Sequence, residues 1–482
     1  MTPRTSTAGR TAVAAWLAAF EDRDGRATGE PAWLREIRHA AMARFASMGW
    51  PTSRDEAWKY TSLAPITSTS FDLDAADAGD LPAAGDPRGD AGDLPEDRLD
   101  EAVVRLPAAI RLVFVNGRYS TRLSSVGPLP AGIRIGSLAG ALFTEPEIVR
   151  SFLARPGALD EAGACSLLNA AWWRDGVVCD VTPGVRLETP IHALFITAGA
   201  GRRLVDHPRS LIQLGPGSRA TFVESALALT GEPSLTNAVT QIALGAGAEL
   251  DHYAVGLTGP QAFRVAETET RQGEGSRLSS CAVVLGGSLT RREMRVRLEA
   301  ETAACTLSGL SVLGGRQHAD QSTVVDHAAP RATSRQLFKA ILDGHARSVF
   351  NGRVIVRPGA NGTDAYQTNK NLLLADGVEA DSKPQLEIYA DDVKCSHGAA
   401  DGQVAEDALF YLKSRGLGED RARTLLTLGF AQEVLDRVRH PELRSWLERR
   451  LAERLHGGRV HEAEPPEVMA ATPAAASAKE MS

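Results

Sequence analysis

Leu214-Gly-Pro-Gly-Ser-Arg-Ala220 is the first of three versions of one short motif in this chain. The second reads Leu244-Gly-Ala-Gly-Ala-Glu-Leu250 and the third Gln272-Gly-Glu-Gly-Ser-Arg-Leu278, with first glycines 30 and then 28 residues apart. We expect a degenerate fourth copy from Ala300. Each copy is a turn that leads into a strand, and recurrence at this interval indicates a solenoid whose rungs bury their apolar faces against their neighbours. The motif therefore predicts a β-helix, in preference to a β-propeller with its longer repeats of about 40 residues.

The pattern of residue types along the chain predicts five segments, and the β-helix core is expected at residues 110–402. Residues 1–70 have apolar residues at helical spacing and are expected to form an N-terminal helical domain. An acidic linker rich in glycine and proline follows at 71–109. Residues 403–456 form a C-terminal helical domain, and 457–482 a disordered tail. The predicted fold class is thus mostly β, a parallel β-helix flanked by α-helical domains.

The composition is that of a globular protein with a sizeable core. The 482 residues are 43% hydrophobic and 23% charged, and the net charge of −7 argues against nucleic acid or anionic lipid as the main partner. No apolar run is long enough to cross a bilayer and the N-terminus lacks a signal-peptide core, so we expect a cytoplasmic protein. The cysteines are odd in number and form no C-x-x-C motif, which disfavours a disulfide framework or a zinc knot. They are Cys165, Cys179, Cys281, Cys305 and Cys395.

Common catalytic signatures are missing from the sequence. It contains no G-x-x-x-x-G-K-[ST] loop, no H-E-x-x-H helix and no G-x-S-x-G elbow. The repeated glycine motif leads into strands rather than helices, so it indicates turn chemistry and not a dinucleotide-binding fingerprint. We therefore expect neither nucleotide hydrolysis nor Rossmann-type nucleotide binding by this chain alone.

Cys395 and His397 lie one residue apart near the end of a polar-edged segment. If the run from Leu386 to His397 is extended, its period of two places both side chains on the same face. A thiolate and an imidazole suit iron or zinc, but two ligands cannot complete a four-coordinate site. The other ligands must come from elsewhere in the chain, from a partner, or from nowhere. The alternative is a surface cysteine beside an unrelated histidine, although Lys394 and the imidazole would favour the thiolate.

A second group contains residue types that bind metals but has no fixed ligand spacing. Such residues at strand ends are more often hydrogen-bonded turn residues than metal ligands. The group consists of His318, Asp320, Asp326, His327 and His345.

Several multi-residue blocks occur in one order along the chain. They are Asp326-His-Ala-Ala-Pro-Arg-Ala-Thr-Ser-Arg-Gln-Leu-Phe-Lys-Ala-Ile-Leu342, Val349-Phe-Asn-Gly-Arg353, Gln367-Thr-Asn-Lys-Asn371 and Lys383-Pro-Gln-Leu-Glu-Ile-Tyr-Ala-Asp-Asp-Val-Lys-Cys-Ser-His-Gly398. With them the chain resembles the SufB/SufD family of iron-sulfur cluster assembly proteins from about residue 110 to 440. The block Gly49-Trp-Pro-Thr-Ser-Arg-Asp-Glu-Ala-Trp-Lys-Tyr-Thr-Ser-Leu63 resembles the SufD branch in particular. The resemblance implies a right-handed parallel β-helix flanked by helical domains.

Two positions and one motif separate the branches of that family. In the SufB branch, cysteines would fall at Asn371 and at Ala431, and both are missing here. The Cys395-Ser-His397 pattern instead resembles the SufD branch, whose histidine at that position faces SufB across a heterodimer. The resemblance further implies a complex of SufB, SufD and two copies of the ATPase SufC. In that complex SufC would dock on the C-terminal helices, residues 403–456.

From this resemblance follows a mechanistic hypothesis. Cys395 and His397 present half of a metal site for a nascent iron-sulfur cluster, SufB supplies the other ligands, and His397 is the stronger candidate of the two. The chain would be a scaffold subunit without catalysis of its own, and ATP-driven movement of SufC would reshape the shared interface. The resemblance leaves open whether a reduced flavin associates with the complex and whether the chain forms a homodimer when SufB is missing.

Three other functions remain open from the sequence. The chain could be a purely structural partner of SufB, or a SufB-like scaffold that binds a cluster alone. A β-helix could also act on polysaccharides, but that chemistry needs a groove of clustered carboxylates, and none is evident across the predicted rungs.

Overall fold

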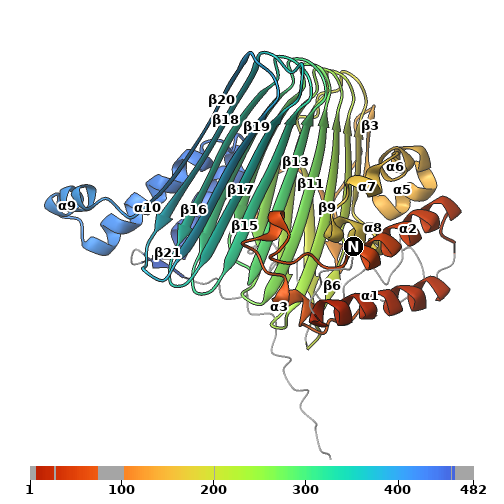
Figure 1. Cartoon of the computed structure of the whole chain (residues 1–482), viewed down its shortest axis with the longest axis horizontal. Coiled ribbons are helices and arrows are strands. Elements are labelled where there is room, and N and C mark those ends of the chain that lie inside the picture. The colour runs from red at the N-terminus through yellow and green to blue at the C-terminus, as the bar shows by residue number, and fades with distance from the viewer. Residues whose placement is uncertain (1–6, 27–28, 74–102, 200, 457–458, 462–482) are drawn as a thin grey trace, which may run out of the picture.

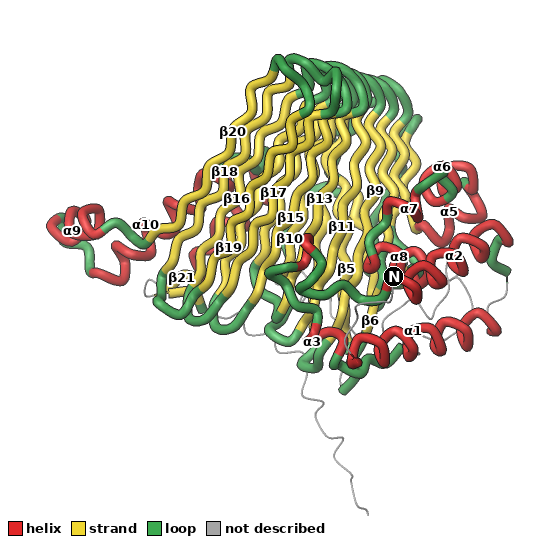
Figure 2. The backbone as a smooth tube through the Cα atoms, viewed as in Figure 1, coloured by secondary structure: helices red, strands yellow, loops and turns green. Residues whose placement is uncertain are grey.

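The structure of the chain, a computed structural model, describes residues 7–26, 29–73, 103–199, 201–456 and 459–461. Two ten-stranded sheets form its centre, and from β7 onward consecutive strands alternate between them, so that each turn of the chain adds one strand to each sheet (Figure 1, Figure 2). Apart from the antiparallel pairs β1–β2 and β3–β4, the strands of both sheets are parallel. The predicted parallel β-helix is confirmed.

In spatial order, the first sheet contains β2 (Arg118–Tyr119), β1 (Ile110–Val115), β5 (Ile191–Ala198), β8 (Arg219–Leu229), β10 (Glu249–Leu257), β12 (Arg277–Val284), β14 (Ala304–Leu313), β16 (Thr333–Leu342), β18 (Thr363–Leu373) and β20 (Val393–Gly402). The second contains β19 (Glu379–Ile388), β17 (Arg347–Val356), β15 (His318–His327), β13 (Leu289–Leu298), β11 (Ala262–Gln272), β9 (Ser234–Leu244), β7 (Arg209–Leu214), β4 (Val177–Val181) and β3 (Ile133–Ser137), with β6 (Val205–Asp206) paired to β9.

The glycine motifs form the stacked turns between the sheets. A Cβ on the first glycine of a motif would crowd the backbone of the preceding turn, as at Gly215, where it would lie 2.6 Å from the nitrogen of Pro183. The second glycine has a left-handed backbone, with φ of 67° at Gly217, and its N–H donates to the carbonyl of Ala246 at 2.8 Å. Thr302 takes this left-handed position in the degenerate fourth copy, with φ of 58°.

Apolar side chains fill most of the space between the two sheets. Ala220, Leu250 and Leu278 are in register on successive strands of the first sheet and are at most 2% exposed. Such stacking buries each rung against the next, and this explains why one repeated turn determines the whole core.

Helices on the N-terminal side cover part of the outer face of the second sheet (Figure 1). Those of residues 138–172 lie inside the range predicted as β-helix core; they are short, so they left little helical periodicity in the sequence. The set is α1 (Thr7–Arg26), α2 (Ala32–Met48), the 3₁₀ helix η1 (Glu56–Trp58), α3 (Ala64–Thr67), α5 (Leu138–Thr144), α6 (Pro146–Leu153), α7 (Ala158–Glu161) and α8 (Ala164–Trp172).

The C-terminal helices are α9 (Glu406–Ser414), α10 (Glu419–Leu435) and α11 (Pro441–Arg454). Helix α10 packs on the outer face of the first sheet at β14 and β16, and the short strands β21 (Leu455–His456) and β22 (Arg459–Val460) follow α11. No helix in the described ranges has the length and apolar character needed to span a membrane. Most of the predicted linker and tail, 74–102, 457–458 and 462–482, lies outside the described residues.

Candidate functional site

The last rung of the β-helix consists of β19 and β20, and it ends both sheets. Within the described part of the chain, β19 pairs only with β17 and β20 only with β18. Figure 1 shows this rung at the end of the solenoid away from the N-terminal helices. Residues 396–402 of β20 are all exposed. One end of the solenoid therefore offers two strand edges and the open space between them.

Cys395 and His397 both lie on β20, in register with Ala365 and Gln367 of β18. Cys395 is half-buried and packs with Val354 and Ala365, which places its side chain on the interior face of the sheet. His397 is two residues further along the same strand, so it shares that face, but it is exposed because no further rung covers it. The run from Leu386 to His397 is not one extended strand, because β19 ends at Ile388 and β20 begins at Val393, but β20 alone places both side chains on one face.

The thiol of Cys395 is not activated by its surroundings. Burial is the largest cause that raises its pKa, the charge of Asp364 raises it further, and only the N–H of Ala365 acts in the opposite direction. Lys394 points to the other face of the strand and is not among the causes. The expectation that Lys394 and the imidazole would favour the thiolate is therefore wrong for this chain, and His397 is the more available donor.

The described residues do not complete a metal site around Cys395 and His397. Across the described ranges, no group of three or more histidine, cysteine, aspartate or glutamate side chains is placed to hold a metal ion. Asp401 lies on the same face of β20, but it accepts a hydrogen bond from Asn371 Nδ2 at 2.7 Å. Within the described residues, the chain therefore adds no third donor beside Cys395 and His397.

The fold does not bring together the five residues of the second group that have metal-binding side chains. Asp320 is buried on the outer face, where it accepts from Thr61 Oγ1 at 2.5 Å and pairs with Arg291, and His318 contacts the same threonine. His327 faces the interior and lies 2.9 Å from Ser334 Oγ. The two other members are separate again: Asp326 pairs with Arg357, and His345 lies in a turn against Gly377.

Polar side chains line the interior behind the last rung, and sequence reasoning missed them. Gln367 is 1% exposed, and neither its amide oxygen nor its amide nitrogen has a hydrogen-bond partner in the described structure. Asn371 donates to Asn369 Oδ1 at 3.0 Å, and Ser382 donates to the same oxygen at 2.5 Å. A Cβ at Gly352 would overlap the amide of Gln367, so only glycine leaves room for it. The signal was the alternation Gln367-Thr-Asn-Lys-Asn371, which puts three amides on one strand face.

The C-terminal helices carry a second candidate surface. Phe410 and Tyr411 of α9 are 74% and 56% exposed, and Leu425 of α10 is 46% exposed. Helices α9 and α10 pack against each other. Large apolar side chains exposed on two neighbouring helices indicate a protein-interaction surface more than a solvated face.

Two family models match the chain over adjacent ranges. Residues 97–193 match the SufBD protein N-terminal region, and residues 195–430 match the SufBD core domain of the SUF system for FeS cluster assembly. The iron-sulfur cluster assembly protein SufD of Escherichia coli is 31% identical over 85% of this chain and 90% of its own length. An iron-sulfur cluster assembly SufBD family protein of Synechocystis sp. is also 31% identical, over 85% of this chain and 88% of its own length.

Proposed function

This chain belongs to the SufBD family of iron-sulfur cluster assembly proteins, and we propose that it is the SufD-type subunit of a scaffold complex with SufB and the ATPase SufC. In this proposal His397, with Cys395 beside it, lends ligands to a nascent cluster that forms between this chain and SufB. The observation that carries the proposal is the open last rung, which presents two soft donors, with no third donor beside them among the residues that the structure describes.

The exposed edges of the last rung support the proposed pairing of this chain with SufB. A sheet edge with unpaired backbone groups is a template for another chain, and proteins normally cover or charge such edges. Here β20 is exposed along most of its length, and Ile388 and Tyr389 at the end of β19 are 41% and 58% exposed. A second β-helix that pairs with these strands would continue the stack and bring its own side chains to His397. SufB is the partner with the matching architecture within this family.

The chemistry of the donors supports a shared site. Iron-sulfur clusters are held mainly by cysteine thiolates, and histidine replaces some of them in certain proteins. His397 can ligate as a neutral imidazole, whereas Cys395 must first lose a proton that its burial holds in place. His397 is therefore the main ligand from this side, and Cys395 is secondary. All five cysteines are free thiols, which is compatible with cluster assembly in a reducing compartment.

The half-site predicts a difference between the isolated chain and the complex. Anaerobic reconstitution of the isolated chain with iron and sulfide should leave no stoichiometric cluster, because two donors cannot saturate the iron. The same treatment of the complex with SufB and SufC should give one. Iron and acid-labile sulfide analysis measures both. A stoichiometric cluster on the isolated chain would favour a SufB-like scaffold, and full iron uptake by a complex without this chain would favour a purely structural role.

The exposed apolar surface of α9 and α10 is proposed as the SufC contact. Changing Phe410 and Leu425 together to aspartate should abolish co-purification of SufC, because burying two carboxylates at an apolar interface costs several kcal/mol. The fold should tolerate the change, since both side chains are largely exposed.

The matched control for this prediction is Phe143→Asp. Phe143 is 59% exposed on α5, which lies on the opposite side of the molecule from α9 (Figure 1), so this variant should bind SufC normally. Undiminished binding of SufC by the Phe410→Asp, Leu425→Asp variant would refute the proposed docking surface.

A further inference from the structure

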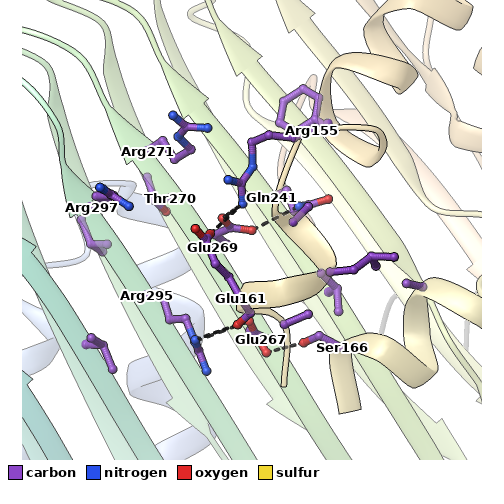
Figure 3. Close-up of a pocket in the computed structure, with 18 of the residues that line it drawn as sticks. Arg155, Glu161, Ser166, Gln241, Glu267, Glu269, Thr270, Arg271, Arg295 and Arg297 are labelled. Carbon is purple, nitrogen blue, oxygen red and sulfur yellow. Dashed lines mark hydrogen bonds and ion pairs between the residues drawn. The ribbon is translucent and has the colours of Figure 1, made fainter. Parts of the chain in front are cut away.

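A cavity of about 410 Å³ lies between the outer face of the second sheet and the helices α6 to α8 (Figure 3). Its floor comes mainly from β11 and β13, and its roof from Phe152, Leu153 and Leu159. It lies on the outside of the solenoid and extends as far as β17, the strand next to β19, but neither His397 nor the α9–α10 surface contributes to it. A volume of this size is within the range of small-molecule sites.

Two arginines on the floor have hydrogen-bonding capacity that the described residues leave unused. Arg271 and Arg297 are in register on neighbouring strands, as Figure 3 shows. They share one carboxylate: Arg271 Nε donates to Glu299 Oε1 at 2.8 Å, and Arg297 Nε lies 3.7 Å from the same oxygen. Within the described ranges, neither guanidinium has a partner at its terminal nitrogens. Two adjacent arginines with one carboxylate between them leave a local excess of positive charge.

A third arginine in the cavity wall is buried without a direct carboxylate partner. Arg209 is 7% exposed and donates to Asn169 Oδ1 and Gln241 Oε1, both at 2.8 Å. Its Nε is buried and lacks a partner in the described structure. Neutral amides do not neutralise a guanidinium, and a buried donor left unpaired carries a free-energy cost that a bound acceptor would remove.

The carboxylates of the cavity, by contrast, are already engaged. Glu269 accepts from Arg155 Nη2 at 3.0 Å and from Gln241 Nε2 at 3.2 Å. Glu267 accepts from Ser166 and lies 3.6 Å from Arg295 Nε. The groups of the cavity that lack partners in the described structure are therefore hydrogen-bond donors. The cavity suits a negatively charged acceptor and not a cation.

The apolar roof of the cavity indicates that the ligand also has an apolar part. Phe152, Leu153 and Leu159 face the floor, and the floor itself contributes Val324 and Ile355 near the arginine pair. We propose that this cavity binds an organic anion with an apolar chain, whose carboxylate or phosphate head lies against Arg271 and Arg297 and whose chain lies under α6 and α7. The proposal is independent of the proposed role in cluster assembly.

Isothermal titration calorimetry of the full-length protein with ligands that share one alkyl chain length tests which class of ligand binds. Decanoate and decyl phosphate carry the two possible heads, and decyltrimethylammonium carries the same chain with a positive charge. We expect saturable binding of at least one of the anions at one site and at least tenfold weaker binding of the cation. The tighter anion identifies the head group. Equal binding of the cation, or no saturable binding of either anion, would overturn the proposal.

The Arg271→Gln, Arg297→Gln variant tests the location. Loss of charge-assisted hydrogen bonds to the head should weaken binding of the tighter anion by about tenfold or more. The matched control is Arg353→Gln, an equally exposed arginine of the same sheet face that pairs with Glu387 outside the cavity, and it should bind as the unmodified chain does. Unchanged binding by the double variant, or an equal loss in the control, would refute the site.

Discussion

Replacing His397 with alanine should lower the iron content of the reconstituted complex with SufB and SufC by at least about tenfold. Even residues that only orient a metal ligand cost about 10- to 100-fold in metal affinity when they are changed, so loss of a ligand should cost no less. The fold should not change, because His397 is exposed on an edge strand and surface substitutions usually alter the free energy of unfolding by less than about 0.5 kcal/mol. Iron analysis of the purified complex measures the effect.

Two variants on the same strand make this result specific. Lys394 is exposed and points to the opposite face of β20, so Lys394→Ala should leave the iron content unchanged. Cys395→Ser should lower it less than His397→Ala, because the half-buried thiol is a weaker donor. Full iron content in the His397→Ala complex, with subunit stoichiometry intact, would contradict the role given to this residue.

Replacing Lys339 with methionine should destabilise the attachment of the C-terminal helices by about 2 kcal/mol, the range of a hydrogen bond from a charged group. Lys339 lies on β16 beneath α10, with only 4% of its side chain exposed. Its Nζ donates to the carbonyl oxygen of Phe430 at 2.8 Å, lies 2.6 Å from Glu433 Oε2 and lies over the Phe430 ring. Methionine preserves the packing of the stem and removes all three interactions. Urea unfolding monitored by circular dichroism measures the change.

The matched control for this prediction is Lys370→Met. Lys370 reaches the same carboxylate at 3.3 Å, but its side chain is 41% exposed, so its loss should cost less than about 0.5 kcal/mol. Equal effects of the two variants would show that burial of Lys339 contributes nothing to the attachment.

The pH dependence of unfolding provides a second test of the same contact. The hydrogen bond from Lys339 is the first of the interactions that hold the pKa of Glu433 below its ordinary value of 4.5. Because the pKa is lower in the folded state, the contribution of Glu433 is complete above the unfolded pKa and is lost as the pH falls through the folded pKa. The unmodified chain should therefore lose more stability on acidification than Lys339→Met does.

Much of the fold could be predicted because one local requirement recurs. Each turn needs a residue with a left-handed backbone, and Gly217 and its successors supply it at nearly constant spacing. The helices of residues 138–172 could not be predicted in this way. They are short, begin at local signals such as Ser137 and Pro146, and are stabilised by burial of residues such as Leu138 and Val149 in the packed structure.

The candidate site could be predicted in part. Alternation along a strand was enough to place Cys395 and His397 on one face, whereas the raised pKa of the Cys395 thiol depends on its burial beside Val354 and on the charge of Asp364, and both of these residues belong to other strands. The cavity with Arg271 and Arg297 was beyond sequence reasoning, because its roof and floor come from segments more than 100 residues apart in the chain. In the sequence alone, Arg271 and Arg297 cannot be distinguished from other exposed strand residues, because the helices that cover them are distant in the chain.

The central claim is that His397 ligates a cluster shared with SufB, and pulsed electron paramagnetic resonance can test it directly. The chain is labelled with ¹⁵N-histidine, combined with unlabelled SufB and SufC, reconstituted and reduced. The account predicts a ¹⁵N hyperfine coupling to the cluster that is present in the unmodified chain and in the Lys394→Ala control, and absent after His397→Gln. A cluster that shows no ¹⁵N coupling from this chain, or keeps it after His397→Gln, would rule out His397 as a ligand.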